Sequence, residues 1–389
     1  MEHYLPMALA SLSLFLAGGC HRMSILAGAI VCQGLSRPPE SMPADGWSYW
    51  GLDARIEPRL RPGTYASATR GVHFIGADDL GPHGYWLTWA EHNGIAYTCR
   101  GGHIDTDHLR KATDWTGYLA AVTLEHLHKG RTAFQFKFRE PSRCFVELTY
   151  PSDWDSRSAE EQVRIARDVS RCLGQYLAYT AMTWHEVLTW FGFRPTGYKS
   201  EFQSAFSWED IYSNLLGTQV GVATLQDKDH PFSEAATLAL RRKLDSLGVQ
   251  PAAIAAQASE AVRGQWYSSW LSFTVIRKRN FDIGLDDGCV SPSIVRCPGV
   301  CDGAREHPLA VPTLGRLSRY GFSARVQIEP RVWEQNKIFR ALYGARKPPT
   351  KRIDPTVHFA RLIDYMRQDA IRRHCFDTVV DSPEPCMGE

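Results

Sequence analysis

The long apolar stripe between Ser158 and Gly192 constrains the fold of this chain more than any other feature. Its apolar and small residues recur every three or four positions, the period of an amphipathic α-helix. They are Val163, Ala166, Val169, Leu173, Leu177, Thr180, Trp184 and Leu188. Ser158 is a good N-cap, and Gly192 followed by Pro195 ends the helical pattern. The sequence therefore predicts one long helix over 158–191.

Other helices and strands are expected in separate runs along the chain. Periodicity and capping residues predict helices at 105–128, 208–217, 232–247, 251–266 and 359–374. Alternating residues predict a hairpin of 134–138 with 144–150, strands at 273–276 and 324–328, and short strands between 72 and 97. Because these elements do not alternate as βαβ units, we expect a predominantly helical α+β fold, with helices packed on a small sheet.

The domain organisation follows from composition along the chain. Residues 1–20 have the form of a signal peptide, and residues 21–61 are rich in Pro, Ser and Arg without periodicity, which favours a linker. We expect one globular domain over 62–375 and a polar tail over 376–389. Lys and Arg number 44 against 42 Asp and Glu. Such a balance gives no basic field able to gather nucleic acid, so no nucleic-acid partner is predicted.

The N-terminal residues predict export. A short apolar run from Met7 to Gly19 ends in small residues before Cys20, the arrangement of a bacterial lipoprotein signal. The run lacks a preceding Lys or Arg, its leucine is one position further from the cysteine than is usual, and a second apolar run follows over 23–31. A cleaved signal without lipid is the alternative. Both interpretations place the protein in the periplasm of the cell envelope, and the first anchors it to a membrane through Cys20.

The chain has ten cysteines, which suits an oxidising compartment where thiols pair as disulfides. Three of them lie in a Gly- and Pro-rich segment over 286–303, together with a nearby histidine. This segment suggests either a disulfide that staples the loop or a zinc site, and the wide cysteine spacing favours the disulfide. The pairing is left open among Cys289, Cys297, Cys301, Cys375 and Cys386.

The first polar cluster lies over 97–110, where two glycines separate a strand from a helix. Asp105 and His108 are three residues apart, so on a first helical turn they share a face and can hold one ion or water. The simpler alternative is that Asp105 only caps the helix and His108 packs. Cys99, beside Arg100, is a second candidate, as a thiolate nucleophile with His103 or His108 as its base.

The second cluster lies near the end of the long helix, where His185 and Glu186 interrupt an aromatic stretch. A charged pair there is costly to bury unless something satisfies it. Adjacent residues point about 100° apart on a helix, so one is expected at the centre and the other in support. Thr189 occupies the position where a zinc protease would carry its second histidine. A standard metalloprotease is therefore disfavoured.

The third cluster spans 201–217 and is rich in polar groups. Glu201 precedes it, and Glu209 and Asp210 sit at the start of a predicted helix, where carboxylates also favour the helix dipole without any further role. Tyr212 and Asn214 follow on the same helix. We assign four residues to substrate contact, namely Arg110, Trp184, Tyr212 and Asn214.

These clusters suggest a metal-dependent hydrolase. Its nitrogen ligands would be His108 and His185, its third ligand Asp105, Glu186, Glu201 or Glu209, and its general base another carboxylate, preferably Glu186 or Glu209. Zinc or another divalent metal is the expected cofactor. The alternatives are a hydrolase or acyltransferase that uses Cys99, and a non-catalytic envelope protein whose aromatic surface binds a glycan, lipid or protein. The substrate class expected is an envelope small molecule, glycan, lipid or peptide.

Five segments together resemble a known family. They are Arg-Pro-Gly-Thr at 61–64, Leu-Gly-Pro-His-Gly-Tyr at 80–85, and the segments 97–110, 183–192 and 208–217. They are similar to the domain-of-unknown-function 4056 family of bacterial lipoproteins. The resemblance implies an envelope lipoprotein and brings no catalytic residues with it.

A single site over the three clusters requires a particular geometry. The start of the 105–128 helix, the end of the 158–191 helix and the start of the 208–217 helix must meet. His108 and either His185 or Glu186 should then lie within roughly 8 Å and line one pocket walled by tryptophans.

Overall fold

The computed structural model describes residues 23–26, 29–32, 46–49, 51–59, 61, 73–86, 90–138, 140–194, 202–270, 273–295 and 299–377. The chain divides into two compact units, Met1–Pro39 and Glu40–Glu389. In the first unit, β1 (Met23–Leu26) pairs antiparallel with β2 (Ala29–Cys32). The predicted signal peptide and Cys20 lie outside the described residues. No helix in the described ranges is both long enough and apolar enough to cross a membrane.

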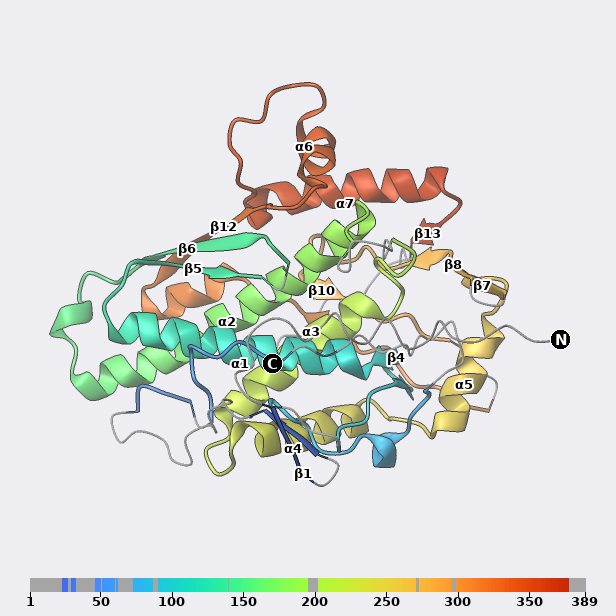
Figure 1. Ribbon diagram of the computed structural model, residues 1–389, viewed down its shortest axis with the longest axis horizontal. Coiled ribbons are helices and arrows are strands. Elements are labelled where there is room, and N and C mark those ends of the chain that lie inside the picture. Colours follow the sequence, from blue (N-terminus) through green and yellow to red (C-terminus); the bar gives the residue numbers. More distant parts are fainter. Residues whose placement is uncertain are drawn as a thin grey trace. The chain divides into compact units, whose positions relative to one another are not determined.

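Three helices form the centre of the second unit. They are α1 (Thr106–His128), α2 (Ala159–Trp190) and α3 (Asp210–Gln226), and each packs against the other two. They lie side by side in the middle of Figure 1. The helices predicted over 105–128 and 158–191 are thus confirmed to within a residue at each end. The third predicted helix begins at Asp210 and extends to Gln226, further than the sequence pattern indicated.

The starts of α1 and α2 follow from their caps. The Asp105 carboxylate accepts hydrogen bonds from the backbone N–H groups of Asp107 and His108, and the Ser158 side chain accepts one from Glu161. Each cap satisfies N–H groups that the first helical turn leaves without a partner. The capping role proposed for Asp105 is therefore confirmed.

A glycine sets how closely α1 and α3 approach. A Cβ atom at Gly217 would overlap the backbone carbonyl of Leu109. Because glycine lacks that atom, the backbone of α3 at Gly217 packs directly against α1. The Thr113 hydroxyl of α1 donates a hydrogen bond to the carbonyl oxygen of Gly217 at 3.0 Å. The first turns of α1 and α3 are thereby held beside each other.

Small antiparallel sheets flank the helices. β5 (Ala133–Lys137) and β12 (Ser323–Glu329) pair on either side of β6 (Arg143–Thr149). The burial of β5 alternates, with Phe134 and Phe136 facing the core. The predicted hairpin and the predicted 324–328 strand are confirmed. Ahead of α1, β3 (Ile95–Thr98) and β4 (Gly102–Asp105) form a hairpin, so Gly102 begins a strand where the sequence suggested an end.

The remaining helices lie along the outside of the bundle or beyond it. They are η1 (Ala77–Asp79), η2 (Trp154–Ser156), α4 (Phe232–Ser246), α5 (Ala252–Ala261), η3 (Leu314–Tyr320), α6 (Gln335–Tyr343) and α7 (Pro355–Arg372). The predicted 251–266 helix is shorter than expected and ends at Ala261, and the chain then turns at Gly264, which has a φ of 82°. The last helix starts earlier than predicted, with Asp354 as its cap and Pro355 in its first turn.

The other strands are short. They are β7 (Tyr267–Trp270), β8 (Phe273–Ile276), β9 (Lys278–Arg279), β10 (Cys289–Val290), β11 (Leu309–Ala310) and β13 (Phe376–Asp377). β13 pairs parallel with β9, at the start of the segment expected to be a polar tail. Helices with small, mainly antiparallel sheets make this a predominantly helical α+β protein, as predicted.

Candidate His/carboxylate centre

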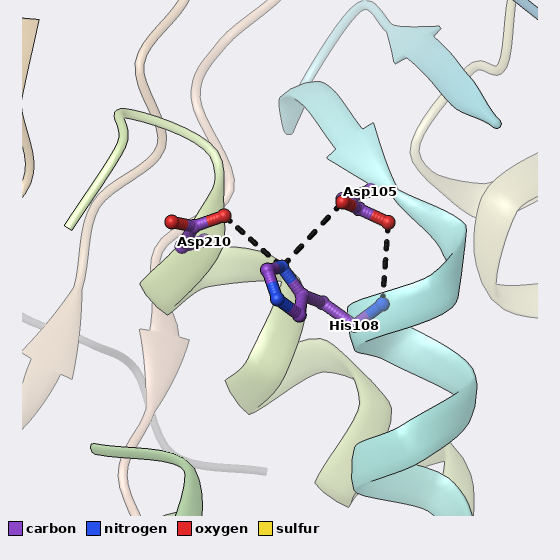
Figure 2. Close-up of side chains that lie close together, drawn as sticks. All are labelled: Asp105, His108 and Asp210. Carbon is purple, nitrogen blue, oxygen red and sulfur yellow. Dashed lines mark hydrogen bonds and ion pairs between the residues drawn. The ribbon is translucent and has the colours of Figure 1, made fainter. Parts of the chain in front are cut away.

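Three side chains meet where α1 and α3 begin, as Figure 2 shows. Asp105 is the last residue of β4 and the cap of α1, His108 lies in the first turn of α1, and Asp210 is the first residue of α3. One potential ligand atom from each lies within 4.8 Å of the other two. The predicted pairing of Asp105 with His108 on one helical face is confirmed, and Asp210 completes a triad.

The backbone fixes the orientation of both carboxylates. Oδ1 of Asp105 accepts from the N–H groups of Asp107 at 2.8 Å and His108 at 3.2 Å. Oδ2 of Asp210 accepts from the N–H of Ser207 at 3.0 Å. The second oxygen of each carboxylate faces His108 Nδ1, at 3.5 Å from Asp105 and 3.0 Å from Asp210. Each aspartate thus presents one oxygen to a common point.

These spacings suit a first-row divalent metal. Ligand atoms held tetrahedrally at about 2.0–2.1 Å from zinc are separated from each other by about 3.3 Å. The two distances from Nδ1 to the aspartate oxygens bracket that value. Two carboxylates and one imidazole make a donor set that zinc and related ions accept, with positions left for water or substrate.

The centre holds more negative charge than its single histidine balances. Burial alone would lower the pKa of His108, but Asp105 and Asp210 outweigh it and raise that pKa to about 10. Burial, reinforced by the charge of Asp210, raises the pKa of Glu186 to about 7 and that of Glu209 to about 8. Crowded, buried carboxylates of this kind favour a cation or protons among them.

Glu186 reaches the centre from α2. It is 3% exposed, and its Oε2 accepts a hydrogen bond from the backbone N–H of Phe206 at 2.8 Å. Phe206 holds that position with a φ of 53°, a left-handed conformation that is strained for a bulky side chain. Strain retained beside crowded carboxylates is typical of functional sites.

A cavity opens beside the triad. Its described lining residues are His108, Lys111, Trp115, Phe138, Glu140, Ala181, Met182, His185, Glu186 and Asn214. The expected meeting of α1, α2 and α3 at one pocket is confirmed by His108, His185, Glu186 and Asn214, and Trp115 is the one tryptophan among its described lining residues, where several were expected. Asn214 is 1% exposed, and its Oδ1 has no hydrogen-bond partner among the described residues. That oxygen is therefore able to accept a hydrogen bond or to coordinate a cation.

His185 does not join the triad. Its Nδ1 pairs with Oε1 of Glu140, which follows β5 and is 6% exposed. A carboxylate on one ring nitrogen orients the imidazole and makes the other nitrogen a better base. His185 therefore lines the cavity as part of a Glu140–His185 pair.

Three residues assigned to substrate contact are buried and bonded within the protein. Arg110 donates to the carbonyl oxygens of Leu80 and Pro82, Trp184 donates to the hydroxyl of Ser142, and Tyr212 donates to the carbonyl oxygen of His307. All three are at most 1% exposed. Arg110, Trp184 and Tyr212 are not among the described residues that line the cavity, so their contact with substrate stays a prediction, whereas Asn214 does line the cavity.

The prediction that Cys99 is a thiolate nucleophile is wrong. Cys99 forms a disulfide with Cys301, so it carries no thiol, and its proposed base His103 donates from Nε2 to the carbonyl oxygen of Ala255. Cys289 is disulfide-bonded as well. The preference for disulfides over zinc in the 286–303 segment is confirmed for Cys289 and Cys301. Cys301, however, pairs with Cys99, which lies outside that loop.

Two residues of the centre were not identified from the sequence. Asp210 was interpreted as a helix-dipole residue, and Glu140 was not singled out. The available signal for Asp210 was its place in the third cluster beside Glu209. Glu140 lies between a strand and a Pro-Ser turn, where a lone carboxylate gives no local signal. Glu201, a predicted ligand, lies outside the described residues.

Fold and centre together define a helical α+β protein with a His/carboxylate triad, its two aspartates buried and its histidine half-buried, at the meeting point of three helices. The family described as protein of unknown function (DUF4056) matches residues 78–289, which include the whole triad, and the chain belongs to this family. The resemblance seen in the sequence is thereby confirmed. Neither a curated protein nor a solved structure matches this chain.

Proposed function

We propose that this protein is a metal-dependent hydrolase with Asp105, His108 and Asp210 as its metal ligands. The observation that carries the proposal is the convergence of two backbone-oriented carboxylate oxygens on His108 Nδ1 at metal-ligand spacing. The unpartnered Asn214 Oδ1 beside the triad and the crowding of Glu186 and Glu209 support it. Zinc or another divalent first-row ion fits this donor set best.

The cavity residues supply the remaining chemistry. A divalent metal bound by three protein ligands lowers the pKa of its water ligand toward neutrality. Glu186 has a pKa near 7 because it is buried, so it can take a proton from a water and return it to a leaving group. His185, oriented by Glu140, faces the same cavity as a second proton carrier.

Metal analysis of the purified protein tests the ligand set. We expect about one equivalent of zinc after incubation and dialysis, and its loss in Asp105→Asn, His108→Gln and Asp210→Asn. Asp78→Asn, at an exposed position of η1, is the matched control and should keep its metal. Glu186→Gln should keep the metal and lose hydrolysis of chromogenic esters. Full metal content in all three ligand variants would end the proposal.

We also propose that the protein is exported to the cell envelope and anchored by lipid on Cys20. Support comes from the Cys99–Cys301 disulfide and the disulfide-bonded Cys289, because such bonds persist in oxidising compartments. The substrate would then be an envelope small molecule, glycan, lipid or peptide. Labelling cells with a radioactive fatty acid should mark the wild-type chain and not Cys20→Ser, and equal labelling of both contradicts the anchor.

A further inference from the structure

A second cavity adjoins the His/carboxylate centre and has the opposite charge. Its volume is about 220 Å³, and its described lining residues are Glu57, Pro58, Arg59, Arg61, Lys111, Trp115, Lys137 and Phe138. Lys111, Trp115 and Phe138 also line the cavity beside the triad. The two cavities are therefore neighbours across these three side chains.

Arg61 forms the inner wall of this second cavity, the basic cavity. It is 1% exposed and pairs with Asp114 and Glu91, which are also buried. Arg110 pairs with the same Glu91 at 3.3 Å. Two guanidinium groups thus share two carboxylates in the interior, and the positive charge of Arg61 is neutralised within this network. It shapes the cavity and is not expected to bind a ligand directly.

Arg59 and Lys111 have N–H donors that no described residue engages. The Arg59 guanidinium donates to the carbonyl oxygen of Gly84 at 2.8 Å and to Glu91 at 2.5 Å, which uses only part of its five N–H groups. Lys111 pairs with Asp107 through one of its three N–H groups. Since Glu91 is already matched by Arg61 and Arg110, Arg59 adds positive charge to the cavity.

Lys137 is a further cation that lines the basic cavity. It ends β5, and it forms no ion pair with a residue that the structure describes. Its cross-strand neighbour on β6 is another cation, Arg143. Four of the described residues that line the basic cavity are cations, namely Arg59, Arg61, Lys111 and Lys137, and Glu57 is an exposed carboxylate at its rim. Because Glu91 and Asp114 neutralise Arg61, and Asp107 pairs with Lys111, the positive excess of the described lining comes from Arg59 and Lys137.

We propose that the basic cavity binds an oxyanion group of the substrate, a phosphate or a carboxylate, while the susceptible bond lies at the His/carboxylate centre. This inference rests on the proposed hydrolase function and adds the substrate class to it. Guanidinium and ammonium groups are the usual partners of such oxyanions. Glu140 and Glu186 line only the cavity beside the triad, whereas Arg59 and Lys137 line only the basic cavity, and this difference in charge favours the oxyanion in the basic cavity.

Trp115 and Phe138 fit this arrangement because both cavities share them. An aromatic wall between the oxyanion site and the triad offers contact to a ring or an aliphatic segment that joins the two ends of the substrate. We therefore expect a small, monoanionic or dianionic molecule, or the charged end of a larger one, with its reacting bond a short distance from the charge.

Calorimetric titration of the full chain with inorganic phosphate and with acetate tests the proposal. The titration is done on protein treated with a chelator, so that anion binding is measured independently of any metal. Saturable binding of one anion is expected, and the tighter of the two identifies the charged group. Lys137→Gln and Arg59→Gln should each weaken it about tenfold or more, because each removes a charge-assisted contact.

Lys347→Gln is the matched control, at an exposed position far along the chain, and should leave the anion affinity unchanged. Lys137 is exposed on a strand, so its variant is expected to fold, and the circular dichroism spectrum checks this. No binding of either anion, or equal affinity in the wild type and both cavity variants, overturns the proposal. The zinc content of the wild type separates the anion-site proposal from the metal-site proposal. A wild type that binds zinc but neither anion rejects only the anion site, and a wild type that binds an anion but no zinc rejects only the metal site.

Discussion

Replacing Asp210 with asparagine removes one anionic ligand from the triad and keeps the size of the side chain. Oδ2 of Asp210 is engaged by the backbone of Ser207, and Oδ1 faces His108 at 3.0 Å. The amide keeps an oxygen but loses the charge that attracts a divalent cation. We therefore expect Asp210→Asn to fold and to lose the stabilisation that zinc gives to the wild type.

Bound zinc is expected to stabilise the folded wild type by a few kcal/mol. A ligand present at a hundred times its dissociation constant stabilises the folded state by about 2.7 kcal/mol. The unit Glu40–Glu389 contains 350 residues. With an unfolding entropy of about 2.1 cal/mol/K per residue, zinc should raise the Tm of the wild type by about 4 °C. If Asp210→Asn binds zinc a hundredfold more weakly, the same zinc concentration stabilises its folded state by only about 0.4 kcal/mol. The Tm of the variant then rises by less than about 1 °C.

Differential scanning calorimetry at pH 7.5, with zinc or with chelator, measures the difference for each protein separately. Comparing the zinc-dependent shift within each variant removes the change in metal-free stability that the mutation itself causes. Asp78→Asn should shift as the wild type does. An equal zinc shift in the wild type and Asp210→Asn would falsify the role of Asp210 as a ligand, and no shift in the wild type contradicts zinc binding altogether.

Three further outcomes are expected from other parts of the structure. Gly217→Ala adds a methyl group that forces α1 and α3 apart, so it should lower the free energy of unfolding by about 1–3 kcal/mol and reduce the zinc content. An unchanged free energy of unfolding and zinc content would contradict the close packing. The folded-state pKa of Glu209 is raised from 4.5 to about 8, mainly by burial, so its contribution to stability is present at low pH and is lost as pH rises toward 8. The Tm of metal-free protein should fall between pH 5 and 8, less steeply in Glu209→Gln, and parallel curves argue against that burial effect. Cys99 should resist iodoacetamide until reduction, and replacing Cys99 and Cys301 by serine, which opens a link across 202 positions, should cost about 2–5 kcal/mol in chemical denaturation.

Local sequence determined the main helices and the capping aspartate. The apolar residues of 158–191 recur every three or four positions, and only a helix places such residues on one face. The observed helix α2 follows this prediction closely. Asp105 accepts from N–H groups two and three residues ahead, so its role depends on neighbours in the chain. The pairing of Asp105 with His108 was predictable for the same reason.

The tertiary structure decided which distant residues complete the centre. His185 looked like a second nitrogen ligand, but the packing of α2 against the segment after β5 turns it toward Glu140. Asp210 takes the place in the triad because the close approach of α1 and α3 at Gly217 brings the first turns of both helices together. Neither result depends on residues near in sequence.

The same limit applies to Cys99, which pairs with a residue 202 positions away, and to Arg110, which is drawn into a buried ion-pair network with Glu91. By itself, the sequence determined the helical α+β class, the caps, the main hairpin and the three polar segments, because these depend on spacing along a few turns or strands. Only the tertiary structure decided which of those polar side chains face one another. That choice depends on how helices cross and how closely they pack, which short-range sequence patterns do not encode.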